Sequence, residues 1–387
     1  MPKPRIALLV NQVAPSRVGL YEHLATALDL TILHGGVERN RDSWKGVCVK
    51  GACDKRMAGW QWSLAKREHG EIFDHWFLHL EPGYIFELIR ERPDGIVTFE
   101  MGFRTMVGLA YGTCFRKPVW VWWGGTSHTE RRVGWFRRLL RDAIARWAKH
   151  WISYGRTSTE YLLTFGVPRE RILQVQNCVD ERWYDDASVE PALSVSPRPV
   201  LLHVGQMIAR KGIAEFLRAA RRLQREGLNF SILMVGGGRD GAKLRRLAAE
   251  LCLENVHFHS AQAPESMPAF YRSGDVLIFP TMEDVWGLVA NEAVLSGLPV
   301  LCSRYAGCAP ELFDAECIFD PADEEQFVEA LRKAVNGQLP RADRSRLWSS
   351  AKVGEVIANA VRESCAGRRP TAPRIKIDAA SRSENQN

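Results

Sequence analysis

The sequence predicts an α/β protein built from two Rossmann-like domains that face a central cleft. Short apolar stretches of strand length alternate with helical stretches from residue 5 onward, and the alternation starts again at residue 199 after a Pro- and Ser-rich segment. This alternation is typical of mostly parallel sheets covered by helices. Because ligands of open α/β sheets bind outside the carboxyl ends of the strands, we expect the two domains to share a ligand cleft.

The first domain is expected over residues 1–190. Its apolar stretches predict strands at 5–10, 29–36, 95–100, 118–123 and 150–155, and an amphipathic pattern predicts a helix at 20–28. Residues 40–75 show no clean periodicity, so no element is predicted there.

The second domain is expected over residues 199–340, after a linker at 191–198. Strands are predicted at 199–205, 230–236, 255–260, 275–280 and 299–303, with a helical stretch between each pair. Residues 341–367 predict a helical segment that packs back on the first domain. The polar, aperiodic residues 368–387 predict a disordered tail.

Composition narrows the class of protein. Hydrophobic residues make up 46% and charged residues 25%, which is typical of soluble globular chains. No apolar run is long enough to span a membrane, and the run at 5–10 is too short for a signal peptide. The odd number of cysteines, 9, lacks paired metal-ligand spacing, so we expect reduced thiols and no metal site. We therefore expect a cytoplasmic protein.

The net charge of +7 is a mild surplus of positive charge. It indicates no nucleic-acid partner, because nucleic-acid sites need a basic stripe. It is compatible with an anionic ligand or an anionic surface.

An acidic loop at the start of a helix is the most specific segment. A predicted strand ends at 280, and Trp286, Gly287 and Leu288 then open a helix whose free N–H groups suit a diphosphate. Asp284 lies before this helix and Glu292 on its second turn, where carboxylates can accept hydrogen bonds from sugar hydroxyls. The alternative is that the acids only complement the helix dipole.

A basic loop follows the first strand of the second domain. Gly205 and Gln206 end the strand, and Arg210 and Lys211 lead into the next helix. Basic side chains at this edge of a sheet can neutralise a diphosphate leaving group. Alternatively they are two solvated loop charges, and as a loop residue Lys211 is expected to contribute little to stability.

The run Gly236-x-Gly238-x-x-Gly241 has the spacing of a dinucleotide-binding turn. An NAD site also needs an acid at the end of the next strand, and that strand ends without one. We therefore interpret the run as a tight strand-to-helix turn.

The acidic and basic segments together resemble retaining glycosyltransferases of family 4, which have the GT-B fold. The stretch D-VWGLVAN-E-A, followed by GLPV, is similar to the E-x7-E signature of that family, with Asp284 in place of the first Glu. The resemblance implies that Asp284 contacts the donor sugar, that Glu292 holds the ribose, and that Lys211 binds the donor phosphates. Gln206 stands where the family has Arg, and Arg210 is the candidate substitute.

Weaker similarities extend the resemblance to residues 5–335. They imply that Gly236, His259 and Ser260 line the nucleotide pocket, and that Arg17 and Gly19 of the opening loop lie near the donor phosphates or the acceptor.

Family members often have a catalytic His directly after the strand that is here 118–123. This chain has Gly124-Gly125 there and His128 further along. His128 is therefore a candidate catalytic residue, and the alternative is an ordinary loop histidine.

The basic segment 131–151 carries Trp135, Leu139, Ala143 and Trp147 at helical spacing. One interpretation is a helix that lies on an anionic membrane surface. The other is a Rossmann helix whose apolar stripe is core and whose arginines are solvated.

These observations predict a retaining glycosyltransferase that needs no metal or cofactor. Its donor is a nucleotide-diphosphate sugar and its acceptor a glycan or a lipid-linked glycan of cell-surface polysaccharide synthesis. We expect it in the cytoplasm, with peripheral contact at the inner face of the membrane. A nucleotide-sugar epimerase, an NAD oxidoreductase and a non-catalytic sugar-binding relative remain alternatives.

Overall fold

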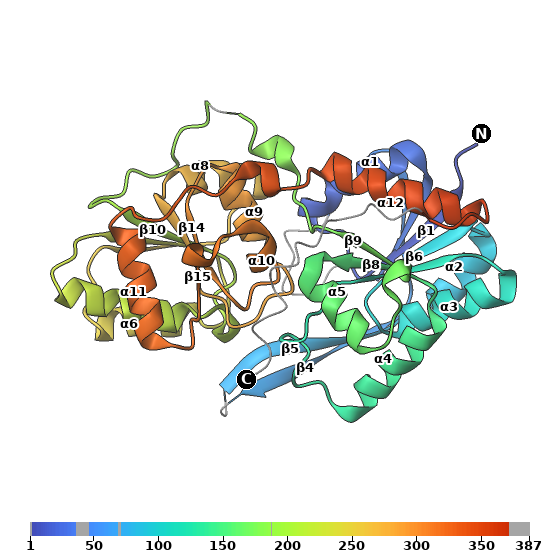
Figure 1. Cartoon of the computed structure of the whole chain (residues 1–387), viewed down its shortest axis with the longest axis horizontal. Helices are drawn as coiled ribbons and strands as arrows, with labels where there is room; N and C mark the ends of the chain where they lie inside the picture. Colours follow the sequence, from blue (N-terminus) through green and yellow to red (C-terminus); the bar gives the residue numbers. More distant parts are fainter. Residues whose placement is uncertain (1, 36–45, 69–70, 187, 371–387) are drawn as a thin grey trace.

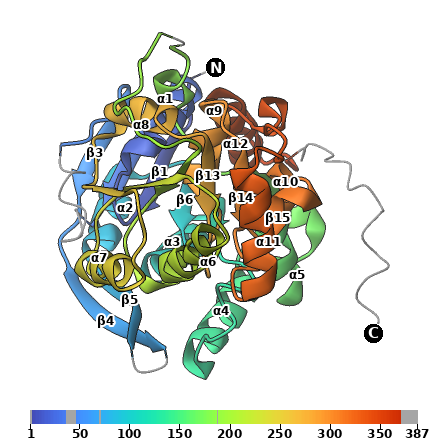
Figure 2. The same cartoon turned by 90° about the vertical axis from the view of Figure 1, so that its left-hand side faces the viewer.

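The chain forms two parallel sheets, each covered by helices, in a computed structural model that describes residues 2–35, 46–68, 71–186 and 188–370. Figure 1 shows the two sheets side by side along the long axis, and Figure 2 views the molecule from the side of the second sheet. The predicted α/β class with two Rossmann-like halves is confirmed. Of the predicted tail, residues 371–387 lie outside the described part of the chain.

The first sheet has the strand order β3-β2-β1-β6-β7-β8-β9. All neighbours pair in parallel, as expected when strands are joined by crossover connections. The strands are β1 (Arg5–Val10), β2 (Asp29–His34), β3 (Ala52–Arg56), β6 (Gly95–Phe99), β7 (Val119–Trp123), β8 (His150–Tyr154) and β9 (Ile172–Val175). Its helices are α1 (Val18–Ala27), α2 (Gly83–Glu91), α3 (Phe103–Phe115), α4 (Trp135–Trp147) and α5 (Gly155–Thr164).

The second sheet has the order β12-β11-β10-β13-β14-β15, again parallel throughout. Its strands are β10 (Val200–Val204), β11 (Ser231–Val235), β12 (Val256–His259), β13 (Val276–Phe279), β14 (Val300–Ser303) and β15 (Ile318–Phe319). Its helices are α6 (Ile213–Arg225), α7 (Gly241–Glu250), α8 (Met267–Arg272), α9 (Leu288–Leu295), α10 (Ala309–Leu312) and α11 (Glu324–Val335). Strands from the centre of both sheets are buried on both faces, which explains their continuous apolar sequences.

The last helix of the chain joins the two halves. The last helix, α12 (Ser350–Cys365), lies along α1 of the first sheet (Figure 1). The indole Nε1 of Trp120 donates to Ser364 Oγ over 3.0 Å, and a Cβ on Gly354 would lie 2.8 Å from the Cβ of His23. The final helix therefore anchors on the half of the molecule that begins the chain.

An antiparallel hairpin of β4 (Trp60–Glu68) and β5 (Glu71–Leu80) protrudes from the first half. It was not predicted, because residues 40–75 alternate poorly between apolar and polar side chains. In both views the hairpin and α4 protrude on the same side of the molecule (Figures 1 and 2). No helix among the described residues is long and apolar enough to cross a membrane.

Candidate functional site

The loops that follow β10 and β13 meet at the carboxyl edge of the second sheet. The N–H of Met282 donates to the carbonyl of Arg210 over 2.8 Å, and Thr281 Oγ1 donates to the same carbonyl over 3.2 Å. Gly212 has φ +66°, and a Cβ there would lie 1.9 Å from the carbonyl oxygen of Pro280. The strand order reverses between β10 and β13, so this crevice is where such sheets bind ligands.

Lys211 and Asp284 form an ion pair in this crevice. Lys211 Nζ lies 2.5 Å from Asp284 Oδ2, and the two side chains are only 12% and 14% exposed. Burial alone would raise the pKa of Asp284, but the charges of Lys211 and Arg210 outweigh it and hold that pKa below its usual value. Two residues predicted from separate motifs thus lie together. The expectation that Lys211 is a solvated charge of little consequence for stability is wrong, because removing it would strand a buried carboxylate.

Arg210 and Gln206 lie in the same basic loop. Arg210 Nη1 donates to the carbonyl of Glu283 over 3.0 Å, which ties the basic loop to the acidic one. Gln206 directly follows Gly205, and its carbonyl accepts from the N–H of Ile208 over 3.0 Å. Arg210 therefore lies beside Asp284, where its charge helps to lower the pKa of that carboxyl.

The glycine-rich turn after β11 packs against the basic loop. Gly236 has φ +151°, and a Cβ there would lie 1.9 Å from the carbonyl oxygen of Gly205. Its N–H donates to the carbonyl of His259 over 3.0 Å at the end of β12. The glycine is needed for close contact between neighbouring loops, in agreement with the turn interpretation. Ser260 follows His259 and is exposed.

Helix α9 begins where the sequence predicted. Gly287 caps it with φ +100°, and a Cβ there would lie 2.4 Å from the ring of Phe279, so the approach of the chain to the helix requires glycine. Leu288 is the first helical residue and is half-buried. The first-turn N–H groups of this helix lie beside the acidic loop.

Trp286 does not offer its side chain to a ligand. It is fully buried, and its indole Nε1 donates to Asn291 Oδ1 over 2.9 Å. Asn291 in turn donates to the carbonyl of Asn177 over 3.0 Å, in the chain segment that connects the two sheets. The side chain of Trp286 therefore packs between the two halves, and the donor contact predicted for this residue concerns its backbone alone.

Glu292 is held by two buried tyrosines. The hydroxyl of Tyr271 donates to Glu292 Oε2 over 2.6 Å, and the hydroxyl of Tyr184 is also hydrogen-bonded to this carboxyl. Burial raises the pKa of Glu292 to about 7, although both hydrogen bonds lower it. The alternative of a plain surface carboxylate is wrong. Nothing in the sequence pattern pointed to the tyrosines, which come from α8 and from the interdomain segment.

The opening loop places Arg17 among aromatic rings. Its guanidinium lies 5.5 Å from the centroids of Phe99 and Trp122 and 5.0 Å from that of Tyr154, whose hydroxyl accepts its hydrogen bond. These rings lie at the carboxyl ends of β6, β7 and β8. Arg17 therefore lies at the carboxyl edge of that sheet.

Gly19 lies two residues further along, in the first turn of α1. A Cβ there would lie 2.9 Å from the carboxylate of Asp180, in the interdomain segment. Glycine at this position therefore lets the opening loop contact the interdomain segment.

His128 connects the first half to the acidic loop. Its Nε2 lies 2.8 Å from the carbonyl oxygen of Met282, and its ring stacks on Tyr305 at 4.2 Å between centroids. Burial, more than the nearby charge of Arg131, lowers the pKa of His128. The ring is thus neutral near pH 7, with one nitrogen bonded to a backbone carbonyl two residues from Asp284.

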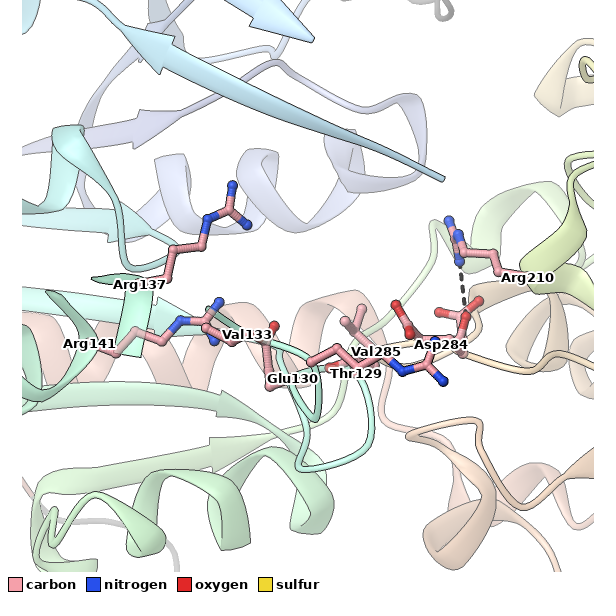
Figure 3. Close-up of a pocket in the computed structure, with 10 residues that line it drawn as sticks. Thr129, Glu130, Val133, Arg137, Arg141, Arg210, Asp284 and Val285 are labelled. Carbon is pink, nitrogen blue, oxygen red and sulfur yellow. Dashed lines mark hydrogen bonds and ion pairs between the residues drawn. The ribbon is translucent and has the colours of Figure 1, made fainter. Parts of the chain in front are cut away.

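A cavity of about 290 Å³ lies between the acidic loop and the segment after β7 (Figure 3). Sequence reasoning missed it as a site. It interpreted the arginine-rich segment either as a membrane-surface helix or as a Rossmann helix with solvated arginines, although a double glycine directly after a strand and a cluster of arginines were visible. The lining residues are Thr129, Glu130, Arg132, Val133, Arg137, Arg141, Arg210, Glu283, Asp284 and Val285.

Helix α4, which supplies part of that lining, has an unexpected orientation. Trp135, Phe136 and Leu139 are 76%, 68% and 57% exposed, whereas Arg141 is only 8% exposed. Arg137 is half-buried on the same side as Arg141 and extends toward the cavity (Figure 3). The expectation of an apolar core stripe with solvated arginines is wrong for the first half of α4.

Residues 186–352 match the family described as glycosyl transferases group 1. Among characterised relatives, the chain is 34% identical over 140 residues to the lipopolysaccharide glucosyltransferase WaaG of Escherichia coli (strain K12), covering 35% of this chain and 37% of WaaG. It is 34% identical over 163 residues to the D-inositol 3-phosphate glycosyltransferase of Nocardia farcinica, covering 39% and 36%. The matches thus span well under two thirds of these relatives.

Solved structures of similar fold cover nearly the whole chain. The Anabaena protein HepE, in complex with UDP and glucose, has a TM-score of 0.67 at 15% identity, covering 94% of this chain and 98% of that one. The sucrose-phosphate synthase of Thermosynechococcus elongatus has a TM-score of 0.65 at 18% identity, covering 95% of each chain. Residues 186–352 are thus similar to the glycosyl transferases group 1 family, and the fold of the chain is GT-B.

Proposed function

We propose that this protein is a retaining glycosyltransferase that moves a sugar from a nucleotide-diphosphate sugar to a glycan or glycolipid. The observation that carries the proposal is the convergence of the Lys211–Asp284 pair, Arg210 and the N-terminus of α9 at the crevice between β10 and β13. A diphosphate needs positive charge on one side, and a donor sugar needs hydrogen-bond acceptors close by. The crevice offers both. The HepE structures with UDP and with UDP-glucose support a nucleotide-sugar donor.

In this proposal the leaving diphosphate is stabilised by Lys211, Arg210 and the free N–H groups that begin α9. The bond between the anomeric carbon and the diphosphate oxygen breaks, and the acceptor oxygen bonds to the same face of that carbon. The acceptor proton goes to an oxygen of the leaving diphosphate. Asp284 orients the donor sugar, and the protein side chains supply the positive charge, so the scheme requires no metal or cofactor.

Glu292 is proposed to hold the ribose. The two tyrosine hydroxyls fix the orientation of its carboxyl group, and the ionised carboxylate can still accept from ribose hydroxyls. His128 is proposed to position the acidic loop through the carbonyl of Met282. Arg17 and Gly19 are proposed to lie at the acceptor side, because they lie at the carboxyl edge of the first sheet.

The acceptor is proposed to be a cell-surface glycan precursor reached at the inner face of the membrane. The exposed Trp135, Phe136 and Leu139 of α4 support this, as do the exposed Trp60 and Trp62 of β4, which protrudes on the same side of the molecule. Aromatic and basic side chains together favour reversible binding to an anionic bilayer. The name of the lipopolysaccharide glucosyltransferase relative agrees with such an acceptor.

The proposal is tested by incubating the protein with a panel of UDP, GDP and ADP sugars and following release of the nucleotide. Hydrolysis or transfer of one donor is expected, with the anomeric configuration retained by NMR. Interconversion of the donor sugar without nucleotide release would indicate an epimerase. Binding without any turnover, in the presence of glycan acceptors, would indicate a sugar-binding relative.

A further inference from the structure

A second cavity of about 290 Å³ lies at the amino edge of the first sheet, where β7, β8 and β9 begin. Trp120, His150 and Ile172, from the starts of these three strands, contribute to its lining. The donor crevice lies beyond the opposite edge, because His128 contacts the acidic loop from the segment after β7. A strand of five residues such as β7 spans about 16 Å. The cavity is therefore separate from the candidate site described above.

Positive side chains from three segments of the chain line this cavity. Lys149 precedes β8, Arg171 precedes β9, and Arg369 follows α12. Glu170 also belongs to the lining. Within the described part of the chain, the side chains of these four residues form no ion pair and no hydrogen bond with another residue. Three cations thus gather around one carboxylate, and none of them is neutralised by a direct contact.

His150 lies in the same cavity and responds to these charges. Its ring stacks on Trp120 at 4.8 Å between centroids, and Trp120 Nε1 donates to Ser364 Oγ over 3.0 Å, so both rings are held in place. Burial lowers the pKa of His150, and the positive charges of Lys149 and Arg171 lower it further. The described residues offer its ring nitrogens no hydrogen bond. A donor of the neutral imidazole is therefore available to a ligand.

The base of the cavity strengthens the attraction for an anion. Trp120, Ile172 and Leu173 are at most 3% exposed, so the charges stand over buried apolar side chains. Electrostatic interactions beside such a surface are stronger than in open water. The alternative is that each cation is solvated on its own. That alternative leaves the repulsion between the gathered cations uncompensated, whereas an anion between them removes it.

We infer that this cavity binds the phosphate group of a small soluble molecule. A phosphate monoester carries about two negative charges near pH 7, which matches three cations facing one carboxylate. Lys149, Arg171 and Arg369 donate to the phosphate oxygens, and an arginine can do so in a bidentate way. The volume of about 290 Å³ is near the lower end for small-molecule sites, so it excludes a long glycan. None of these residues lies in the donor crevice, and the site is independent of the proposed function.

The test titrates the full chain with inorganic phosphate, glucose 6-phosphate and glucose by calorimetry, with UDP present to occupy the donor crevice. Glucose 6-phosphate should bind at least about tenfold more tightly than glucose, because only the phosphate carries charge. Proton NMR of the histidine rings provides a second readout. The pKa of His150 should rise when phosphate binds, since a nearby anion favours the charged ring. His150→Asn removes this resonance and thereby assigns it.

Matched variants locate the site. Lys149→Gln and Arg171→Gln should each weaken phosphate binding about tenfold, through loss of a charge-assisted hydrogen bond. Both residues are exposed, so both variants are expected to fold. Arg146→Gln removes an equally exposed positive charge that lies outside the lining, and its affinity should match that of the wild type. None of the three variants should change the affinity for UDP.

Several outcomes would overturn the inference. Equal binding of glucose and glucose 6-phosphate would do so, and an equal loss in Arg146→Gln would indicate non-specific attraction. A shifting histidine resonance that persists in His150→Asn would place the anion elsewhere. Phosphate binding that occurs only without UDP would belong to the donor crevice. If the wild type binds no UDP or other nucleotide diphosphate, the proposed function fails, whereas the comparison of Lys149→Gln with Arg146→Gln still decides the phosphate site.

The source of the phosphate is distinguished in the same experiment. Tighter binding of glucose 6-phosphate than of inorganic phosphate supports a phosphorylated metabolite, and equal binding supports free phosphate. Sedimentation with phosphatidylglycerol vesicles is the further arm. If Lys149→Gln and Arg171→Gln weaken sedimentation while neither soluble phosphate binds, the cluster contacts a membrane surface and the small-molecule site is wrong.

Discussion

Helices α6 and α4 are similar in length and arginine content, but they bury different kinds of side chain. Each is 13 residues long, is rich in arginine, and follows a loop of the candidate site. In α6 the apolar residues Phe216 and Leu217 are fully buried against the second sheet. In the first half of α4 the aromatic residues face solvent, and Arg137 and Arg141 face the protein.

The difference reflects what each helix has to cover. Helix α6 lies over a sheet, so its apolar stripe is removed from water in the usual way. The first half of α4 lies over a polar cavity with Glu130 beneath it, and a buried carboxylate favours an arginine opposite. On the proposed donor side the loops carry the candidate site residues, and α6 only packs. On the opposite side α4 itself lines the cavity with Arg137 and Arg141.

The largest expected effect tests which side chains α6 and α4 bury. Phe216→Ala should lower the free energy of unfolding by about 4 kcal/mol, because it leaves a cavity in the core. Trp135→Ala should change it by less than about 0.5 kcal/mol, because the ring is exposed. Urea unfolding measures both. A similar loss in the two variants would show that Trp135 is packed, and the contrast between the helices would be lost.

The buried Lys211–Asp284 ion pair makes both turnover and stability sensitive to substitution of Lys211. Lys211→Ala should lower turnover about a hundredfold and the free energy of unfolding by about 3 kcal/mol, since Asp284 is left buried without its partner. Steady-state rates and thermal unfolding check the two effects. Lys333→Ala, at an exposed site on α11, is the control and should alter neither. Turnover within a few-fold of wild type would remove Lys211 from the leaving-group site.

Glu292 should give the donor side a pH dependence. Glu292→Gln should weaken nucleotide-diphosphate binding by about 1.5–3 kcal/mol at pH 8, through loss of a charge-assisted hydrogen bond. Because burial raises the pKa of Glu292 to about 7, affinity of the wild type should rise as pH increases through 7. Calorimetry at pH 6, 7 and 8 checks this. The affinity of Glu292→Gln should not rise with pH. If it rises in parallel with that of the wild type, Glu292 is not the group responsible.

Ionisation of Glu292 should strengthen ligand binding but lower the stability of the ligand-free fold. In the unfolded chain it loses its proton near pH 4.3, whereas in the folded protein it keeps the proton to about pH 7. The ligand-free wild type should therefore lose stability between pH 5 and 7 relative to Glu292→Gln.

The smallest expected effect concerns the exposed face of α4. Trp135→Ser with Arg138→Glu should weaken sedimentation with anionic vesicles, since each basic residue near such a surface contributes about 1 kcal/mol. Donor hydrolysis should not change. Arg141 is unsuitable for this test because it is buried and paired. If the wild type fails to bind these vesicles at low salt, the exposed face of α4 does not bind membranes.

Most strands were predictable, because central parallel strands are buried on both faces and therefore apolar throughout. The predictions at 5–10, 29–36 and 275–280 agree with β1, β2 and β13 to within two residues. The hairpin at 60–80 was missed because its strands alternate too weakly. The short strand β15 has only two residues and gives no periodic signal.

The sequence by itself determined the two-sheet α/β class and the two loops that meet at the crevice between β10 and β13, because strand ends, glycines and charged loop residues follow local rules. Only the tertiary structure decided which face of α4 is buried, that Trp286 packs between the halves, and that Tyr184 and Tyr271 hold Glu292. Each of these depends on partners outside the helix itself, and helical periodicity specifies that one face is buried without specifying what it meets.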